Sequence, residues 1–213
     1  NAIAFSFKDQ VIFEEKEITK ADGLPYTVYT PFKNKWLEKY KSMAPVLEYD
    51  ATDVFSNFHK CDFVFPSLEQ IGFEKSPIKV KPHNLKFIAN YQDIRDFPAL
   101  DQTSYLSPHL RFGTVSIRKL VNWAFHKNDV FLSELIWREF FMQILFSFPK
   151  VVTQNFKTAY DGIKWRNNEA DFQRWCSGTT GYPMVDAGMR QLNETGYMHN
   201  RVRMVAASCL CKH

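Results

Sequence analysis

The sequence predicts a mostly α-helical protein whose first 35 residues are a β-rich remnant of another domain. After Tyr91, apolar residues recur at the three- and four-residue spacing of helices that pack on a core. The first 35 residues contain short apolar alternations, and residues 36–90 carry four prolines with only a weak periodicity. We therefore expect a β-rich remnant at 1–35, an interdomain linker at 36–90 and a helical domain at 91–213.

The β-rich prediction depends on short extended segments. Residues 3–7 alternate and residues 11–13 are apolar, which indicates strand, turn and strand. Ala21-Asp22-Gly23 predicts a turn, and residues 26–31 are extended by composition. A lone hairpin this short is marginally stable, and the helical pattern of 201–213 stops without a Gly cap or a following Pro. Both ends are therefore expected to be cut from something larger.

The second half of the chain has a strong helical periodicity and no internal repeat or low-complexity tract. The pattern predicts helices near 84–92, 108–111, 114–126, 131–148, 169–176, 183–195 and 198–212.

Composition limits the classes of function. Aromatic residues make up 16% of the chain, which requires a large core or stacking partners. The 27 Lys and Arg against 23 Asp and Glu give a formal charge of +4, compatible with a local basic groove but not with histone-like binding. The four cysteines form no CxxC pair, so we expect neither a disulfide framework nor a metal site. Without a membrane span or a signal pattern, a soluble cytoplasmic protein is expected.

Three aliphatic hydroxyl groups precede a proline in Thr103-Ser-Tyr-Leu-Ser-Pro108. Pro108 suits the first position of a helix, which makes Ser107 the natural N-cap. Free N–H groups and hydroxyls at a helix start form an anion site suited to a diphosphate. A capped helix without a ligand is the open alternative.

The segment 131–141 predicts a deeply packed helix with a functional face. One face carries Glu134, Trp137, Arg138 and Phe141. Another face is an apolar stripe of Leu132, Ile136, Phe140 and Ile144. Charges on so apolar a helix must be paired or face a cavity. The alternative to a cavity is an intrahelical ion pair between Glu134 and Arg138, at positions i and i+4.

Residues 197–204 open the last predicted helix. At helical spacing, one face carries Asn200, Arg203, Met204 and Ala207. Methionine on a helix is more often core filler than a ligand contact, and His199 is more often a satisfied histidine than a catalyst. Arg201 and Arg203 point to different sides of the helix, so one can serve DNA phosphate while the other points inward. Their spacing does not say which does what.

These segments form an ordered series of motifs. They are Tyr91 with Arg95-Asp-Phe-Pro98, Thr103-Ser-Tyr-Leu-Ser107, Glu134-Leu-Ile-Trp-Arg-Glu-Phe140, Thr180-Gly-Tyr-Pro183 with Val185-Asp186, Met189-Arg-Gln-Leu192, and His199-Asn-Arg-Val-Arg-Met204. The series resembles the flavin domain of class I photolyases in the photolyase/cryptochrome family, and the resemblance covers essentially the whole chain. Residues 29–36 are similar to the tail of that family's N-terminal α/β antenna domain. The resemblance implies an incomplete photolyase-type flavin-binding domain.

The resemblance also implies FAD as the cofactor. The FAD contacts that it carries over are Tyr91, Thr103, Ser104, Tyr105, Leu106, Ser107, Phe131, Arg138 and Arg203. The hydroxyl cluster would lie at the phosphates, and Phe131 stands where many members have Trp, so that a ring is retained. An antenna chromophore of folate or deazaflavin type would belong to the missing N-terminal domain.

A pyrimidine dimer in DNA is the substrate that the resemblance implies. The catalytic residues that line its cavity would be Glu134, Trp137, Asn200 and Met204. The DNA-binding residues would be Arg95, Glu134, Trp137, Arg138, Phe141, Asn200 and Arg201. Trp165 resembles the outermost member of the family's tryptophan chain for electron transfer, and its alternative is an ordinary aromatic anchor at a helix edge.

The expected activity is light-driven repair of cyclobutane dimers by electron transfer from reduced FAD, with no metal and no membrane partner. The first alternative is a flavin-based cryptochrome photoreceptor, although Met204 resembles the dimer-repairing branch, where single-strand-preferring cryptochromes usually carry Gln. The second is a helical nucleic-acid-binding module without flavin, which leaves the hydroxyl cluster and Glu134 unexplained. The 213 residues alone are expected to be inactive, and copies of them to associate.

Overall fold

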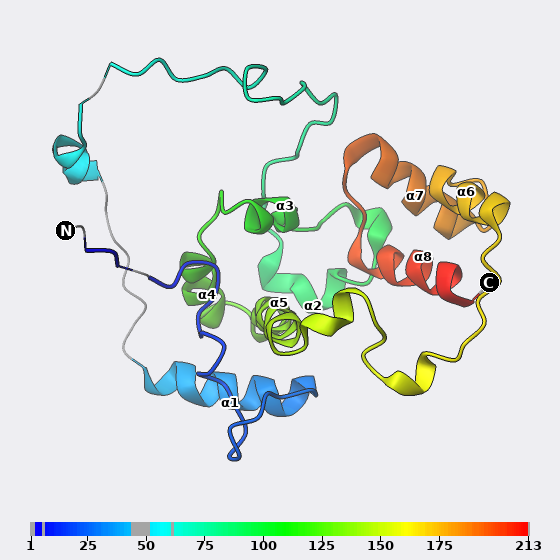
Figure 1. Ribbon diagram of the computed structural model, residues 1–213, viewed down its shortest axis with the longest axis horizontal. Helices are drawn as coiled ribbons and strands as arrows, with labels where there is room; N and C mark the ends of the chain where they lie inside the picture. The colour runs from blue at the N-terminus through cyan, green and yellow to red at the C-terminus, as the bar shows by residue number, and fades with distance from the viewer. Residues whose placement is uncertain (1–2, 6, 44–51, 61, 213) are drawn as a thin grey trace.

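The computed structural model of the protein describes residues 3–5, 7–43, 52–60 and 62–212, which Figure 1 draws as helices joined by long connections. The α-helices are α1 (Tyr29–Ser42), α2 (Tyr91–Ile94), α3 (Leu106–Arg111), α4 (Ile117–Phe125), α5 (Asp129–Ser147), α6 (Glu169–Ser177), α7 (Pro183–Thr195) and α8 (Asn200–Lys212). Short 3-10 helices are η1 (Thr52–Asn57), η2 (Ile88–Asn90), η3 (Pro98–Leu100), η4 (Pro149–Val152) and η5 (Thr158–Tyr160). No helix in these described ranges is long and apolar enough to cross a membrane. The mostly helical prediction is confirmed.

Helix α5 is central to the larger of two hydrophobic clusters. Its start is fixed by Asn128, whose side chain accepts a hydrogen bond from the Phe131 N–H at 2.9 Å. Its buried side chains pack with those of α1 and α4. The predicted apolar stripe lies in this cluster: Leu132, Ile136 and Phe140 are buried, and Ile144 is partly buried. The opposite face of α5 is thereby held in place as one wall of the candidate site.

Helix α1 begins inside the segment that was expected to be extended, so the prediction for residues 26–31 is wrong from Tyr29 onward. Pro31 is the third helical residue, where a backbone N–H would have no partner within the helix. Three aromatic rings then recur every fourth residue and are buried: Phe32, Trp36 and Tyr40. Burial of this aromatic face outweighs the local preference of the segment for extended structure.

The β-rich start is not found. Residues 3–35, apart from Ser6, which lies outside the described residues, contain no strand, and only one isolated bridge joins Thr19 to Pro25 around the predicted turn at Ala21-Asp22-Gly23. Ile12 and Phe13 are buried, but their N–H groups donate to the carboxylate of Glu139 at 2.8 and 3.1 Å. A buried carboxylate on α5 thus satisfies the backbone donors that a neighbouring strand would otherwise satisfy.

The second hydrophobic cluster is built by α6, α7 and α8, which lie side by side in Figure 1. Its buried members are Val185, Met189, Met198, Val202 and Ala206. A Cβ atom on Gly188 would lie 2.3 Å from Val202 Cγ1, so glycine allows α7 and α8 to approach closely. Trp175 of α6 donates from its indole N–H to the Ala206 carbonyl at 2.9 Å. The helices therefore form two packed bodies, one around α5 and one made of α6, α7 and α8. We call the boundary between them the seam.

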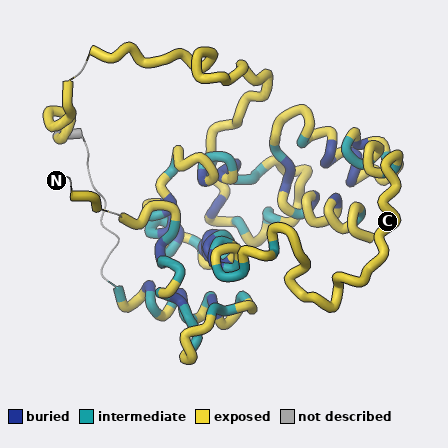
Figure 2. The backbone as a smooth tube through the Cα atoms, in the orientation of Figure 1, coloured by how far each residue is buried: buried dark blue, intermediate teal, exposed yellow. Residues whose placement is uncertain are grey.

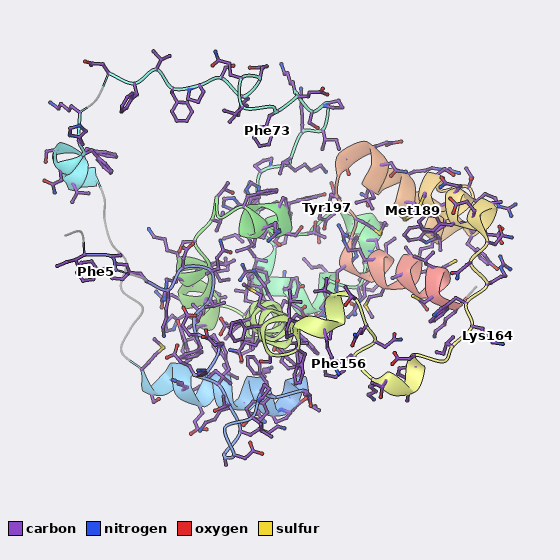
Figure 3. All side chains as sticks on the ribbon, viewed as in Figure 1. Phe5, Phe73, Phe156, Lys164, Met189 and Tyr197 are labelled. Atoms are coloured by element: carbon purple, nitrogen blue, oxygen red, sulfur yellow. The ribbon has the colours of Figure 1, made fainter. Side chains whose placement is uncertain are left out.

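Figure 2 shows the buried residues concentrated in these helices, while the connection before α2 is exposed along most of its length. Residues 62–83 are exposed throughout. Phe73, labelled in Figure 3, lies on this outlying connection. The connection rejoins the helices where the N–H of Asn84 donates to the carbonyl of Ser104 at 2.8 Å.

Candidate functional site

Two adjoining cavities lie along the seam between the two packed bodies. A cavity of about 270 Å³ is lined by the hydroxyl-rich loop 102–107, by α2 and by the start of α8. A cavity of about 900 Å³ is lined mainly by α3, α5 and α8. Residues common to both linings are Tyr91, Arg95, Ser104, Leu106, Ser107, Asn200 and Arg201. The two spaces therefore form one site of a size that suits a cofactor and part of a substrate.

Every residue predicted to contact FAD, substrate or DNA lines at least one of these cavities. The smaller cavity also receives Thr103, Tyr105 and Arg203. The larger cavity also receives Phe131, Glu134, Trp137, Arg138, Phe141 and Met204. Trp165 lies elsewhere, in the connection before α6, and is 53% exposed. The structure thus brings together residues that are more than 100 positions apart.

The hydroxyl loop is held in an unusual backbone conformation. Helix α3 begins at Leu106, so the predictions of Ser107 as N-cap and of Pro108 as the first helical residue are wrong. Tyr105, directly before the helix, is left-handed with φ 53°. Its ring packs 4.7 Å from that of Tyr197, and its hydroxyl contacts Asp101 and Lys81. These contacts hold a conformation that a non-glycine residue adopts only at a cost.

Thr103, which lines the smaller cavity, has a buried hydroxyl group. Tyr197, labelled in Figure 3 between α7 and α8, faces Thr103 with its hydroxyl. The geometry nevertheless leaves the buried Thr103 Oγ1 without a hydrogen bond in the described part of the protein. Since buried polar groups are nearly always paired, this buried oxygen is an exception beside the smaller cavity.

Aromatic rings form the boundary between the two cavities. Tyr91 and the buried Phe131 meet edge to face with ring centroids 5.3 Å apart, and the Arg95 guanidinium lies 5.4 Å from the centre of the Tyr91 ring. Burial, together with the charge of Glu134, raises the pKa of Tyr91 to about 12. Tyr91 is therefore a neutral hydrogen-bonding ring at neutral pH.

Glu134 and Arg138 do not use each other as partners. Glu134 Oε1 pairs with Arg95 Nη1 at 2.8 Å. Arg138 Nη1 donates to the Gln10 carbonyl at 2.8 Å, and Nη2 donates to Gln10 Oε1 at 3.1 Å. The intrahelical ion pair that the spacing allowed is thus replaced by two contacts to distant segments. Gln10 also lines the larger cavity, and no pattern in the sequence indicated it.

Trp137 is held by stacked rings. Tyr29 of α1 lies almost parallel to it, at 9°, with ring centroids 3.5 Å apart. Phe141 stacks on it with centroids 5.4 Å apart and an angle of 21°. The Tyr29 hydroxyl donates to the Ser133 carbonyl at 2.8 Å, which fixes the Tyr29 ring on α5. The plane of Trp137 is therefore set before any ligand arrives.

The start of α8 supplies the polar rim of the site. His199 is buried, and its Nδ1 accepts a hydrogen bond from the Arg201 N–H at 3.2 Å, which favours the interpretation as a satisfied histidine. Burial lowers the pKa of His199. Arg203 Nε donates to the Met198 carbonyl at 3.0 Å, whereas Arg201 Nε donates to Asp96 Oδ1 at 2.5 Å. Arg203 is thus tied to its own helix start, and Arg201 reaches across the seam.

The chain is similar in sequence and in fold to several known proteins. Residues 131–213 match the family described as the FAD binding domain of DNA photolyase. A deoxyribodipyrimidine photo-lyase of Halobacterium salinarum is 38% identical over 97% of this chain and 48% of its own length. The chain spans about half the length of the curated relatives that it matches.

Solved structures give the same result. The fold matches a bacterial class III photolyase from Agrobacterium tumefaciens with a TM-score of 0.70 at 30% identity, covering 98% of this chain and 48% of that one. An archaeal photolyase from Sulfolobus tokodaii, whose structure holds two FAD molecules, matches 61% of this chain and 29% of its own with a TM-score of 0.54 and 45% identity. Taken with the matched domain and the relatives along the whole chain, these likenesses show that the chain is similar to DNA photolyases in both sequence and fold.

Proposed function

We propose that this chain provides one side of the flavin and substrate site of a photolyase that repairs cyclobutane pyrimidine dimers in DNA. The observation that carries the proposal is the lining of the two adjoining cavities. It contains all the FAD, substrate and DNA residues that the family resemblance implies, apart from Trp165. FAD, when bound, supplies the light-excited electron donor, and the protein supplies position, polarity and dryness.

The smaller cavity fits the diphosphate end of FAD. Thr103 Oγ1 lacks a hydrogen-bond partner, and Ser104 and Ser107 add further hydroxyls. Arg203 adds positive charge to the same lining. Phosphate oxygens accept hydrogen bonds from hydroxyls and from guanidinium groups, so these side chains would hold the anion. Phe131 would give an aromatic contact on the side of the larger cavity.

The larger cavity fits a pyrimidine dimer that has left the DNA stack. Photolyases extrude their target, because a dimer inside the duplex cannot reach a buried cofactor. Trp137 would give a flat apolar wall and Met204 an adaptable one. Glu134 and Asn200 would hydrogen-bond the base edges or stabilise charge that develops there. Arg95 and Arg201, which line both cavities, would meet DNA phosphates.

Further parts of the proposal concern the whole protein. The chain would comprise a short tail of the antenna domain at 1–35, a linker at 36–90 and part of the FAD domain at 91–213. An antenna chromophore of folate or deazaflavin type would bind to a domain outside these residues. By itself the chain would hold FAD weakly and would not repair DNA, because flavin affinity depends on enclosure from both sides. Trp165, exposed before α6, would pass electrons to the cofactor during photoreduction.

The test uses a photolyase-length protein that contains these 213 residues. It should purify with a flavin absorbance spectrum, which a helical DNA-binding module without cofactor would lack. Under blue light it should convert a thymine dimer in an oligonucleotide to two thymines. Flavin without repair would instead favour the cryptochrome photoreceptor.

A further inference from the structure

One oxygen of Asp96 faces two arginines from different parts of the fold. Arg201 Nε donates to Asp96 Oδ1 at 2.5 Å. Arg95 Nε lies 3.7 Å from the same oxygen, close enough for a charge interaction although too far for a hydrogen bond. Arg95 directly follows α2, whereas Arg201 lies on α8. The carboxylate therefore bridges the seam between the two packed bodies.

The far ends of both arginines lead toward the larger cavity. Arg95 Nη1 pairs with Glu134 Oε1 at 2.8 Å, and Arg201 Nη1 contacts Met204 Sδ at 3.4 Å. Glu134 and Met204 both line this cavity, and so do the two arginines, but Asp96 is absent from both linings. Arg201 is thus held by a hydrogen bond at Nε, Arg95 Nε lies within charge-interaction distance of the same oxygen, and both side chains reach the site at Nη1.

This arrangement uses the geometry of the guanidinium group. Arginine presents its donors in a rigid planar fork, so a carboxylate at Nε fixes the direction of the Nη groups. An arginine side chain loses rotamer entropy when it is immobilised, and a prior contact reduces the entropy that a ligand must still remove. Asp96 is 54% exposed at its side chain, so its own pairing with Arg201 adds little to the stability of the fold.

We propose that Asp96 is a positioning residue that orients Arg95 and Arg201 together for DNA phosphate. The inference rests on the proposed function, since DNA is the polyanion that these arginines would meet. By its negative charge alone, Asp96 would weaken the binding of DNA. As a positioning residue, it would strengthen that binding. That opposition in sign makes the role measurable.

The matched comparison is Asp96→Asn with Asp93→Asn in a photolyase-length protein that contains these 213 residues. Asp93 is an exposed residue of α2, so both variants remove one negative charge from the same segment. Binding of an undamaged single-stranded oligonucleotide is measured by fluorescence anisotropy over a series of salt concentrations. Asp93→Asn should tighten binding slightly. Asp96→Asn should weaken it about two- to tenfold relative to Asp93→Asn, and this loss should be smaller in an Arg201→Ala background, where only Arg95 remains to be oriented.

Tighter binding by Asp96→Asn than by Asp93→Asn would overturn the proposal, since Asp96 would then compete with phosphate. An equal effect of Asp96→Asn in the Arg201→Ala background would also overturn it.

A second measurement does not depend on DNA. In protein labelled with ¹⁵N-arginine, Asp96→Asn should shift the Nε–H signals of both Arg95 and Arg201, assigned through their Lys variants, while Asp93→Asn leaves them in place. Arg190 Nε donates to the Gly178 carbonyl at 2.9 Å, and its unchanged signal reports that the variant is folded. If only one arginine responds, the shared role is wrong. If both respond but the wild-type photolyase-length protein binds no DNA, the proposed DNA function fails while the contact itself stands.

Discussion

Arg95 Nη1 lies 2.8 Å from Glu134 Oε1, so α2 and α5 meet through an ion pair at the wall of the larger cavity. Both side chains are mostly buried, with 19% and 27% of their surfaces exposed. The ion pair fixes the orientation of the Glu134 carboxylate through Oε1 and leaves Oε2 for a substrate. The role proposed for Glu134 in repair therefore includes Arg95.

Glu134→Ala, in a photolyase-length protein that contains this chain, should lower the quantum yield of dimer repair and leave the bound flavin nearly unchanged. The reason is that Glu134 lines only the larger cavity, away from the hydroxyl loop. Flavin absorbance per protein and dimers repaired per absorbed photon are the two readouts. A double-mutant cycle with Arg95→Ala should give a coupling of about 1 kcal/mol in DNA binding. Parallel loss of flavin and activity would assign Glu134 a structural role.

Trp137→Ala should weaken the discrimination of damaged from undamaged DNA by about 1 to 3 kcal/mol, because a large stacking surface is lost. Tyr29→Ala should reproduce part of this effect, since Tyr29 sets the plane of Trp137. Tyr29→Phe is the matched control, because it keeps the stacked ring and removes only the hydrogen bond to Ser133. Binding constants for a dimer-containing oligonucleotide and its undamaged counterpart give the comparison. If dimer affinity stays the same in Trp137→Ala, Trp137 serves only the core.

Neutralising Arg201 or Arg95 should weaken damaged and undamaged DNA alike, and should reduce the slope of log affinity against log salt by about one contact. Both side chains reach the cavity rim and would meet phosphate, which carries no sequence or damage information. Arg118→Ala is the control, since Arg118 lies on α4 and lines neither cavity. A loss confined to damaged DNA is the result that this account does not allow.

Glu139 should make the stability of the fold depend on pH. Its buried carboxylate accepts hydrogen bonds from the N–H groups of Ile12, Phe13 and Trp36, yet burial raises its pKa above the ordinary 4.5. The folded state then binds the proton more tightly than the unfolded state, so this contribution is fully present below pH 4.5 and is lost as the pH rises through the folded pKa. Urea unfolding should show a wild-type advantage over Glu139→Gln that shrinks as the pH rises from 4.5.

Glu139→Ala tests the same residue at fixed pH. It leaves three buried donors without an acceptor, at a cost of about 1 to 3 kcal/mol each before relaxation. A change under 1 kcal/mol in the free energy of unfolding would mean that the N-terminal segment is not held by this carboxylate.

The 213-residue chain alone should bind FAD weakly and should associate with other copies. Large apolar side chains are exposed on α5 and α8, including Phe141 at 60% and Met204 at 57%. Exposed apolar surface favours association. Bound flavin after dialysis and mass from light scattering provide the test. A monomer that retains one FAD per chain would show that the site is more complete than proposed.

Local patterns in the sequence predicted α4 to α8 and one face of the site, but they missed α1, and the helix expected near 84–92 is found only from Ile88 to Ile94 as η2 and α2. The limits of α7 agree with the predicted 183–195, because Pro183 begins the helix and Gly196 ends it with a positive φ of 68°. Glu134, Trp137, Arg138 and Phe141 line one cavity as their helical spacing indicated. Here the periodicity of the chain and the packing of the fold require the same arrangement.

The remaining features depend on contacts between distant segments. Glu139 replaced the expected strand partner of Ile12 and Phe13 across more than 120 residues. Helix α3 starts at Leu106, two residues before the predicted Pro108, because Tyr197 and Lys81 hold the preceding Tyr105 from elsewhere in the chain. Such tertiary contacts leave no signal in local spacing.

Repair under light tests the central claim most directly. A photolyase-length protein that contains this chain, reduced and mixed with an oligonucleotide bearing one thymine dimer, is exposed to blue light, and the intact thymines are counted against a dark control. The account predicts light-dependent restoration that Glu134→Ala diminishes while the flavin spectrum persists. A protein that holds flavin and binds the dimer, yet restores no thymine in the light, would contradict it.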